Sequence, residues 1–365
     1  MNWKQTLFWS FSAAAIFYYF LLFGVFVFVG QEEMQLFIPE WWYIREFLFQ
    51  PGGFCAVAGQ WIIQYYRQPM SAVVFHTVLL VGCGFMVYRI LRCFLTSLPA
   101  VPFLLPVLYL VKMSIHGEYL VDGTVGVVLM LLALSVSLKV RRAGSIAGYG
   151  IASTLFLCGL TGLLSVCYAF LYTLLALLRY KTSRQRLAAS ACLIPALFIY
   201  LFSGWLGIPV PLSDGWMPEA YLEIQRLPHY YMYRVWTFFT LSIVGVALFA
   251  RFVPVIGEKS KWMDRVALVV CLITVLVSIR FCLPEPWHAQ RMMLDELSFL
   301  ARERQWDAII DKYRGKQIYN YVSLNYLNMS LAHKGELADR MFTFDQKGTK
   351  AYVPIGIRPF TWIVY

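Results

Sequence analysis

The stretch "LFWSFSAAAIFYYFLLFGVFVFVGQEE", residues 7–33, decides the fold class of this chain. It is apolar as far as Val29, which is close to the roughly 20 residues that one helix needs to cross a bilayer. Two adjacent carboxylates, Glu32 and Glu33, then end the run. Because Lys4 precedes the run and no small-residue cleavage site follows it, the sequence predicts a retained membrane anchor.

The composition of the whole chain is that of an integral membrane protein. Of its 365 residues, 60% are hydrophobic and 14% are charged, and the mean hydropathy is +0.62. Soluble domains average about a quarter charged residues. The net charge of +11 fits basic cytoplasmic loops, so no nucleic-acid partner is predicted. The eight cysteines have no CxxC spacing and predict neither a disulfide framework nor a zinc site.

Further apolar stretches predict an all-α, polytopic transmembrane bundle of about nine spans. The stretch 145–178 is too long for one crossing and lies between basic clusters, so it predicts a tight pair that turns near "GLTG", residues 159–162. The other predicted spans are 71–95, 98–113, 119–138, 187–206, 235–250 and 266–282. Residues 1–282 therefore form the predicted membrane domain, with a large outer loop at 30–70.

The distribution of charge predicts the orientation of these spans. Cytoplasmic loops collect Lys and Arg, and the basic clusters 89–92, 141–142 and 179–186 fall at alternate span ends. Most carboxylates before residue 283 fall at the opposite ends. We therefore expect a bacterial inner (plasma) membrane protein, with a cytoplasmic N-terminus and an extracytoplasmic region after residue 282.

The region 283–365 predicts a soluble tail of helical repeats. "LARERQWDAIIDKY", residues 300–313, aligns with "LAHKGELADRMFTF", residues 331–344, at an offset of 31 residues. This offset is close to the tetratricopeptide period of about 34 residues. We expect Phe299 and Trp306 to pack against Tyr326 and Leu331. Because a stacked repeat needs a polar cap, the sequence also suggests a tail that is truncated at residue 365.

The predicted outer loops contain aromatic and ionisable residues. Trp41 and Trp42 suit a short helix in the membrane interface, followed by the turn Pro51-Gly52-Gly53 and a second helix; they would equally suit an ordinary aromatic belt. "KMSIHGEYLVDG", residues 112–123, places His116, Glu118 and Asp122 near a membrane surface, where ionisable groups tend to face a cavity or a partner. Lys112 could instead close this loop by pairing with a carboxylate.

Several of these segments resemble known families. "QEEMQLF", "QPGG" followed by "QWIIQYYRQP", and "SLNYLNMSLAHKGELADRMFTFDQ" are similar to a family of bacterial multi-pass membrane proteins with a tetratricopeptide-like end and no established activity. More distantly, a first span followed by an acidic pair resembles the type C glycosyltransferases. That resemblance implies a catalytic carboxylate at Glu32 or Glu33 and a polyprenyl-phosphate sugar donor. The usual signature contains Asp, whereas both residues here are Glu.

Two functions from different classes remain open. The first is an extracytoplasmic glycosyltransferase, in which Glu32 or Glu33 takes a proton from the acceptor and basic residues hold the departing phosphate. The second is a non-enzymatic scaffold or assembly protein, anchored among membrane lipids, whose helical repeats bind envelope proteins. The acidic pair could also be a plain polar span end. The substrate-binding candidates are Arg45, Arg67, His116, Glu118, Asp122, Arg226 and Arg234.

The glycosyltransferase hypothesis makes a spatial prediction. At least one of Glu32 and Glu33 should point into a cleft under the first outer loop, near His116, Glu118 or Asp122 and lined by Arg226 or Arg234. A divalent metal ion is a cofactor that such a carboxylate cluster would allow, although no residue is assigned as a metal ligand. Glutamates that lie far from these loops would favour the scaffold.

Overall fold

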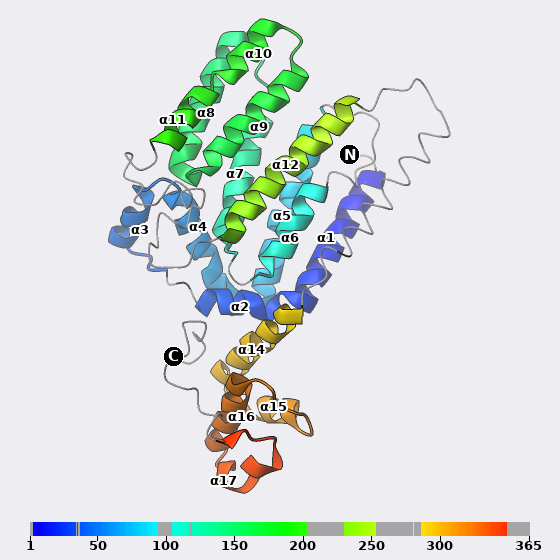
Figure 1. Ribbon diagram of the computed structural model, residues 1–365, viewed down its shortest axis with the longest axis vertical. Coiled ribbons are helices and arrows are strands. Elements are labelled where there is room, and N and C mark those ends of the chain that lie inside the picture. The colour runs from blue at the N-terminus through cyan, green and yellow to red at the C-terminus, as the bar shows by residue number, and fades with distance from the viewer. Residues whose placement is uncertain are drawn as a thin grey trace.

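The computed structural model describes residues 3–33, 35, 37–93, 104–116, 119–202, 230–252, 280 and 286–348. Every regular element in this described part is a helix, which confirms the all-α prediction. The helices form two bodies that meet along α2 and α14: a bundle from α1 to α12, and a smaller tail from α14 to α17 (Figure 1).

Among the described residues, three helices are long and apolar enough to cross a membrane, not the nine predicted. They belong to α1 (Trp3–Phe23), α5 (Pro69–Leu91) and α8 (Ala143–Thr161). The predicted span 266–282 lies outside the described residues except for residue 280. Four further apolar stretches are shorter: α6 (Leu105–Ser114), α7 (Val121–Ser137), α9 (Leu164–Arg179) and residues Val235–Leu248 of α12 (Tyr230–Phe252).

A bend at Gly24 explains why the first apolar run is not one straight span. The chain turns there from α1 into α2 (Val25–Glu33), which lies across the end of the bundle (Figure 1). A Cβ atom on Gly24 would lie 2.9 Å from the Phe28 ring, so glycine lets that ring fold back. The Phe28 ring then stacks on His76 of α5, with centroids 4.2 Å apart. The predicted span 187–206 is likewise divided, into α10 (Ser183–Ser190) and α11 (Leu193–Leu201).

Two predicted turns are confirmed. The predicted first outer loop forms α3 (Trp41–Leu48), α4 (Gly53–Ile63) and the short 3-10 helix η1 (Gln64–Arg67). Between α3 and α4, Gly52 has φ of 85°, and any side chain on Gly53 would overlap the Phe47 carbonyl oxygen. The stretch 145–178 forms the predicted helical pair, α8 and α9, which turns at Gly162 with φ of 63°.

The basic clusters of the bundle gather at one end. Arg179 donates a 2.5 Å hydrogen bond to the Leu138 carbonyl, and Gln185 donates one of 2.8 Å to the Arg141 carbonyl. These contacts join the α7–α8 turn to the start of α10. Figure 1 shows α10 at the end of the bundle opposite the tail.

The tail has its own apolar core, which contains Leu297, Ile309, Leu324 and Leu331. Its helices are α14 (Pro286–Arg302), α15 (Trp306–Tyr313), α16 (Tyr321–His333) and α17 (Leu337–Arg340), and the short 3-10 helix η4 (Met341–Thr343) follows. Trp306 packs against this core as predicted, and its ring also stacks on His333 at 4.4 Å. Phe299 was predicted to do the same, but its ring instead lies 5.9 Å from Phe26 of α2.

The offset of 31 residues reappears in the backbone of the tail. At the end of α14, the Gln305 amide donates to the Leu300 carbonyl at 2.8 Å, and at the end of α16 the Glu336 amide donates to Leu331, also at 2.8 Å. Each bond encloses a residue with positive φ, 55° at Arg304 and 73° at Gly335. This is the hydrogen bond that closes a helix at a left-handed residue. The first helix of each pair therefore ends in the same way.

Candidate functional site

The junction of the bundle and the tail brings together the polar residues that end the first apolar run. Four side chains of α14 recur at helical spacing and so occupy one face: Arg291, Asp295, Ser298 and Arg302. This face packs against α2. The interface begins at the bend of the first run, where His288 Nε2 lies 3.2 Å from the Phe23 carbonyl oxygen.

Glu32 and Glu33 both bind one guanidinium group. Nη1 of Arg302 lies 3.0 Å from Glu32 Oε2 and 3.3 Å from Glu33 Oε1. Ser298 Oγ donates a further 3.0 Å hydrogen bond to Glu33 Oε2. The side chains are 20% exposed at Glu32, 33% at Glu33 and 28% at Arg302, so solvent screens the pair only in part.

The position of this ion pair follows from the helix ends. Glu32 and Glu33 are the last residues of α2, where the partial negative charge of the helix dipole disfavours carboxylates. Arg302 is the last residue of α14, where the dipole favours a cation. The two carboxylates at the end of α2, where the dipole disfavours them, are therefore stabilised by the Arg302 cation at the end of α14. This contact joins the tail to the bundle.

Asp295 is the most buried ionisable group of this face. A Cβ atom on Gly30 would lie 3.0 Å from Asp295 Oδ1, so the glycine allows α2 and α14 to approach closely. The nearest described cation is Arg291, whose Nε lies 4.0 Å from Asp295 Oδ2. Burial raises the pKa of Asp295 to about 7, the Arg291 charge lowers it, and the Glu33 charge raises it further.

Glu33 is shifted in the same direction for similar reasons. Burial raises the pKa of its carboxyl group above the usual range, and the nearby Glu32 charge adds to this effect. The hydrogen bond from Ser298 and the charge of Arg302 act the other way. The junction therefore contains two carboxyl groups that hold protons more readily than exposed ones.

The acidic pair also adjoins one of the predicted outer loops. Gln31 is fully buried, and its Nε2 donates to the carbonyl oxygens of Tyr119 at 2.9 Å and His116 at 3.4 Å. Asp122 is buried at the start of α7, and its Oδ1 accepts a 2.8 Å hydrogen bond from the Gly123 amide. The end of α2 and the segment 116–122 are therefore neighbours, while the described partners of the glutamates lie on α14.

The remaining predicted binding residues are not gathered at this point. Arg45 and Arg67 are exposed on α3 and η1, and the Arg45 guanidinium lies over the Phe49 ring at 5.7 Å. Glu118, Arg226 and the side chain of Arg234 lie outside the described residues. The roles of these residues in binding, and of the two glutamates in catalysis, stay predictions. No group of three or more His, Cys, Asp and Glu side chains that could hold a metal occurs in the described part.

Sequence reasoning missed the α14 residues that complete the site. Arg302, Ser298 and Asp295 belong to a tail helix that was assigned to the repeats alone. One signal was available, because these residues form a polar stripe on a helix whose other face is apolar. A polar stripe on a repeat helix is usually solvated, however, and the carboxylates that cover it lie about 270 residues earlier in the chain.

The chain was compared with known proteins. A family model described as "Family of unknown function (DUF6057)" matches residues 1–364. The chain belongs to this family. No curated protein and no solved structure matches it. Membership of the DUF6057 family agrees with the resemblance to a family without an established activity. It adds no support for the glycosyltransferase or tetratricopeptide resemblance.

Proposed function

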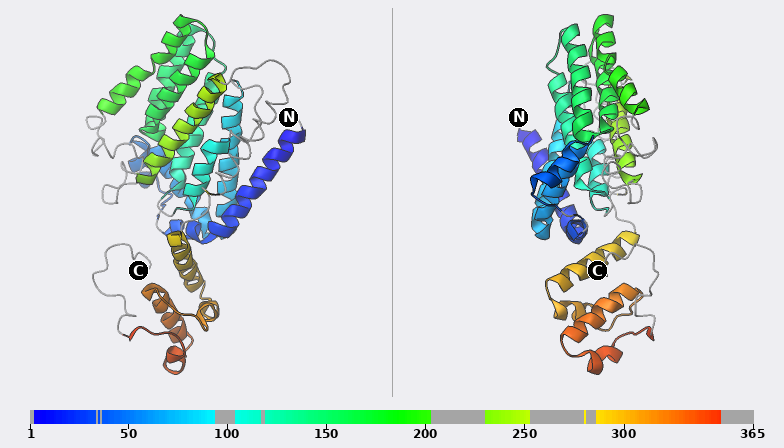
Figure 2. Two further views of the ribbon diagram at one scale, coloured as in Figure 1. Left: turned by 45° about the vertical axis from the view of Figure 1, so that its right-hand side comes forward. Right: turned by 90° about the vertical axis from the view of Figure 1, so that its left-hand side faces the viewer.

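We propose that this DUF6057 protein is a membrane-anchored scaffold whose tail is held in a fixed position at one end of the bundle. The observation that carries the proposal is the contact of Arg302 with both Glu32 and Glu33. An ion pair at the end of two helices, backed by the Phe26–Phe299 contact, suits a docking joint. The helical repeats then project beyond the joint (Figure 2).

The tail offers a surface for a protein partner. A groove of about 220 Å³ runs between α14 and the segment that joins α15 to α16. Its surface is mostly apolar, with Met293 and Ile318 among the lining residues, and Gln290, Lys316 and Tyr319 add polar groups. The apolar surface can pack against an extended segment, while Lys316 and the amide groups can bind carboxylates that the segment carries. The proposed partner is therefore an envelope protein with an acidic, extended segment.

The proposal includes the predicted orientation. The basic end of the bundle faces the cytoplasm, and the tail lies outside the bacterial inner membrane. The gathering of Arg141 and Arg179 at the end opposite the tail supports this arrangement, because cytoplasmic ends collect basic residues. The exposed Trp41 and Trp42 support contact of α3 with lipid at the other surface.

Photo-crosslinking in whole cells tests the scaffold. A photoreactive analogue at Tyr319, which is 81% exposed and lines the groove, should give a discrete adduct with one protein. Lys316→Glu should abolish that adduct, because it opposes an acidic segment. The same analogue at Phe342, which is 80% exposed and is not a lining residue of the groove, is the matched control. No adduct at Tyr319, or equal adducts at both positions, would contradict the proposal.

A disulfide trap tests the docking joint itself. Gly30→Cys and Asp295→Cys place two thiols where a Gly30 Cβ would lie 3.1 Å from Asp295 Cγ, so oxidation of membranes should link residues 30 and 295. The control pair, Gly30→Cys with Asp311→Cys, uses an exposed residue of α15. The link should form in the first pair only.

The glycosyltransferase is the second candidate, with a sugar transferred from a polyprenyl phosphate. One observation favours it: burial raises the pKa of Glu33, which makes its carboxylate a stronger base than an exposed one. Glu33→Gln separates the two functions. The glutamine amide oxygen can still accept the hydrogen bond of Arg302, and the amide nitrogen can donate one to Ser298 Oγ. A scaffold should therefore keep its Tyr319 adduct, whereas an enzyme that uses Glu33 should lose sugar transfer.

A further inference from the structure

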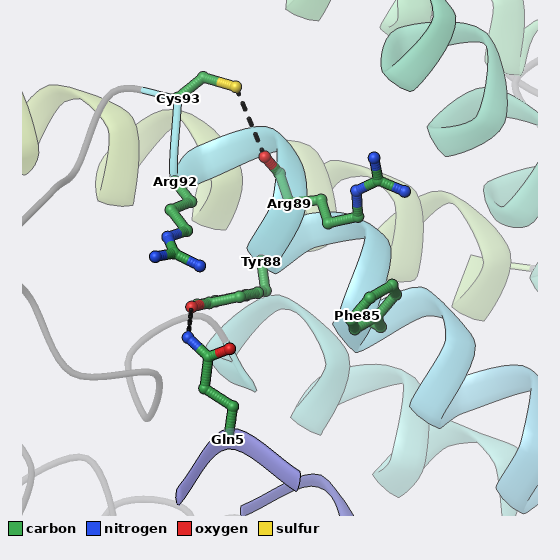
Figure 3. A pocket seen from close by; sticks show the side chains of 6 residues that line it. All are labelled: Gln5, Phe85, Tyr88, Arg89, Arg92 and Cys93. Atoms are coloured by element: carbon green, nitrogen blue, oxygen red, sulfur yellow. Dashed lines mark hydrogen bonds between the residues drawn. The ribbon is translucent and has the colours of Figure 1, made fainter. Parts of the chain in front are cut away.

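A cavity of about 380 Å³ lies at the end of the bundle opposite the tail, between the start of α1 and the end of α5. Gln5 of α1 lines it, together with Phe85, Tyr88, Arg89, Arg92 and Cys93 (Figure 3). The two helices contain candidate membrane spans that begin at Gln5 and end at Leu91. The cavity therefore lies at the level of a membrane surface, where these spans end.

The polar lining of the cavity is held in position. Gln5 Nε2 donates a 2.8 Å hydrogen bond to the Tyr88 hydroxyl group. The Arg92 guanidinium lies 5.7 Å from the centre of the Tyr88 ring, whereas Figure 3 shows the Arg89 side chain extending away from Arg92, toward the side of Phe85. The Trp9 ring packs edge-on against both aromatic rings, with its centroid 5.9 Å from that of Tyr88 and 5.7 Å from that of Phe85. One cation therefore lies beside the fixed hydroxyl group, and a second lines the other side of the cavity.

Within the described residues, no acidic side chain balances the charge of the cavity. No described carboxylate lies within ion-pair distance of Arg89 or Arg92. The sequence contains no Asp or Glu between Glu46 and Glu118, nor before Glu32. Neither α1 nor the chain on either side of the two arginines can therefore supply one. The site is cationic, and its complement is an anion.

The surroundings of the cavity are apolar along α5. Val78 is 65% exposed and Phe85, which lines the cavity, is 36% exposed. These two residues are seven positions apart and therefore share one helix face. An anion that enters the cavity can therefore extend hydrocarbon chains along this face of α5. A free phosphate ion would leave this surface unused.

We propose that this cavity binds the headgroup phosphate of an anionic phospholipid, with Arg92 on the phosphate, Arg89 adding positive charge on the other side of the cavity, and the acyl chains along α5. Guanidinium groups form paired, charge-assisted hydrogen bonds with phosphate. The predicted cytoplasmic leaflet is the one in which basic pockets between helices meet anionic lipids. The lipid would join the ends of two candidate spans. This inference goes beyond the proposed scaffold and does not depend on it.

Native mass spectrometry of the full chain, purified in detergent, tests this site. Phosphatidylglycerol is titrated into the wild type and into the double variant Arg89→Gln/Arg92→Gln. We expect the double variant to lose affinity by at least about tenfold, because each charge-assisted hydrogen bond is worth a factor of that order. The control, Arg141→Gln/Arg142→Gln, removes two cations from the same end of the bundle and should bind as the wild type does.

Further titrations in the same experiment identify the class of ligand. Phosphatidylcholine should bind more weakly than phosphatidylglycerol, and inorganic phosphate should not displace the bound lipid. Arg89→Lys/Arg92→Lys keeps the charge but loses the planar contacts, so intermediate affinity is expected. Equal binding of the two lipids, displacement by phosphate, or an unchanged double glutamine variant would each overturn the proposal. Both arginines are exposed, and an unchanged melting temperature without lipid would show that the variants fold.

Discussion

Arg302 connects the two bodies at the docking joint, since one of its nitrogens bonds two carboxylates of α2. Arg302→Ala would leave Glu32 and Glu33 at a helix end that disfavours negative charge. We expect docking to weaken by about 1–2 kcal/mol, less than for a fully buried pair because all three side chains are partly exposed. Hydrogen exchange of the α14 amides should then accelerate about tenfold or more.

A matched control separates this loss from a general effect of removing an arginine. Arg314 pairs with Asp311 at 2.8 Å, but both side chains are more than 60% exposed. Arg314→Ala should therefore change exchange in α14 by less than about 0.5 kcal/mol. Equal effects of the two substitutions on hydrogen exchange in α14 would show that the Arg302 ion pair does not stabilise docking.

Asp295 should make docking depend on pH. Its pKa is raised to about 7 in the docked tail and would return toward about 4 when the tail is undocked and solvated. The docked state therefore binds more protons between these values, so docking should strengthen as the pH falls from about 8 to about 5. The stabilisation is lost as the pH rises through 7. Besides burial, the charges of Arg291 and Glu33 shift the pKa of Asp295, and burial and the Glu33 and Asp295 charges in turn raise the pKa of Tyr326.

Hydrogen exchange of α14, corrected for intrinsic rates, measures this dependence. Asp295→Asn keeps the shape but cannot ionise, so its docking should resemble the wild type at low pH and vary less with pH. Protection that rises with pH in the wild type would give the opposite sign and exclude this role for Asp295.

At the scale of single residues, the sequence revealed Glu32 and Glu33 but not their partners. The glutamates are visible because two charges end an apolar run. Arg302 is not visible as their partner, because the pairing depends on how two bodies pack and spans about 270 positions of the chain. Asp295 gains its raised pKa from the same packing.

The helices of the tail offer a test of the repeat. Arg304 has φ of 55° at the position where the second repeat has Gly335 with φ of 73°. A left-handed conformation costs a residue with a Cβ atom roughly 1–2 kcal/mol, whereas glycine adopts it freely but loses more entropy on folding. Arg304→Gly should therefore stabilise the tail by roughly 0.5–1 kcal/mol, since the Arg304 side chain is exposed.

This gain can be measured by heating the full chain and using proteolytic cleavage within the tail to detect the temperature at which the tail unfolds. Gly335→Ala is the converse substitution and should destabilise the tail, although no atom lies within 4 Å of its added Cβ. A loss of stability in Arg304→Gly would indicate that the arginine side chain, and not its backbone, determines this helix end.

At the scale of elements, predictions made from local signals succeeded. The Pro51-Gly52-Gly53 turn and the α8–α9 turn are marked by glycines at positions of positive φ. The bend at Gly24 was missed because apolar residues continue on both sides of it. Only the packing of Phe28 against His76 shows why the chain turns there. For the same reason, apolar length alone predicted more crossings than the described helices provide.

For the whole molecule, the orientation can be tested with reporter fusions. Fusions after Lys139, Arg186 and Lys261 should report the cytoplasm, because basic residues gather around these points. A fusion after Asp345 should report the outside. A reporter that gives the same location after Arg186 and after Asp345 would refute the predicted placement of the tail.

The docking of α14 on α2 also has a consequence for the order in which the protein is made. Arg302 follows Glu32 by 270 residues, so at about 5–20 residues per second the ribosome adds it roughly 15–50 s later. During that interval the nascent chain must keep α2 in place without its later partner. The stack of Phe28 on His76 becomes available first, because α5 is synthesised long before α14. The joint is therefore completed only when α14 has been synthesised, although α2 is made near the start of translation.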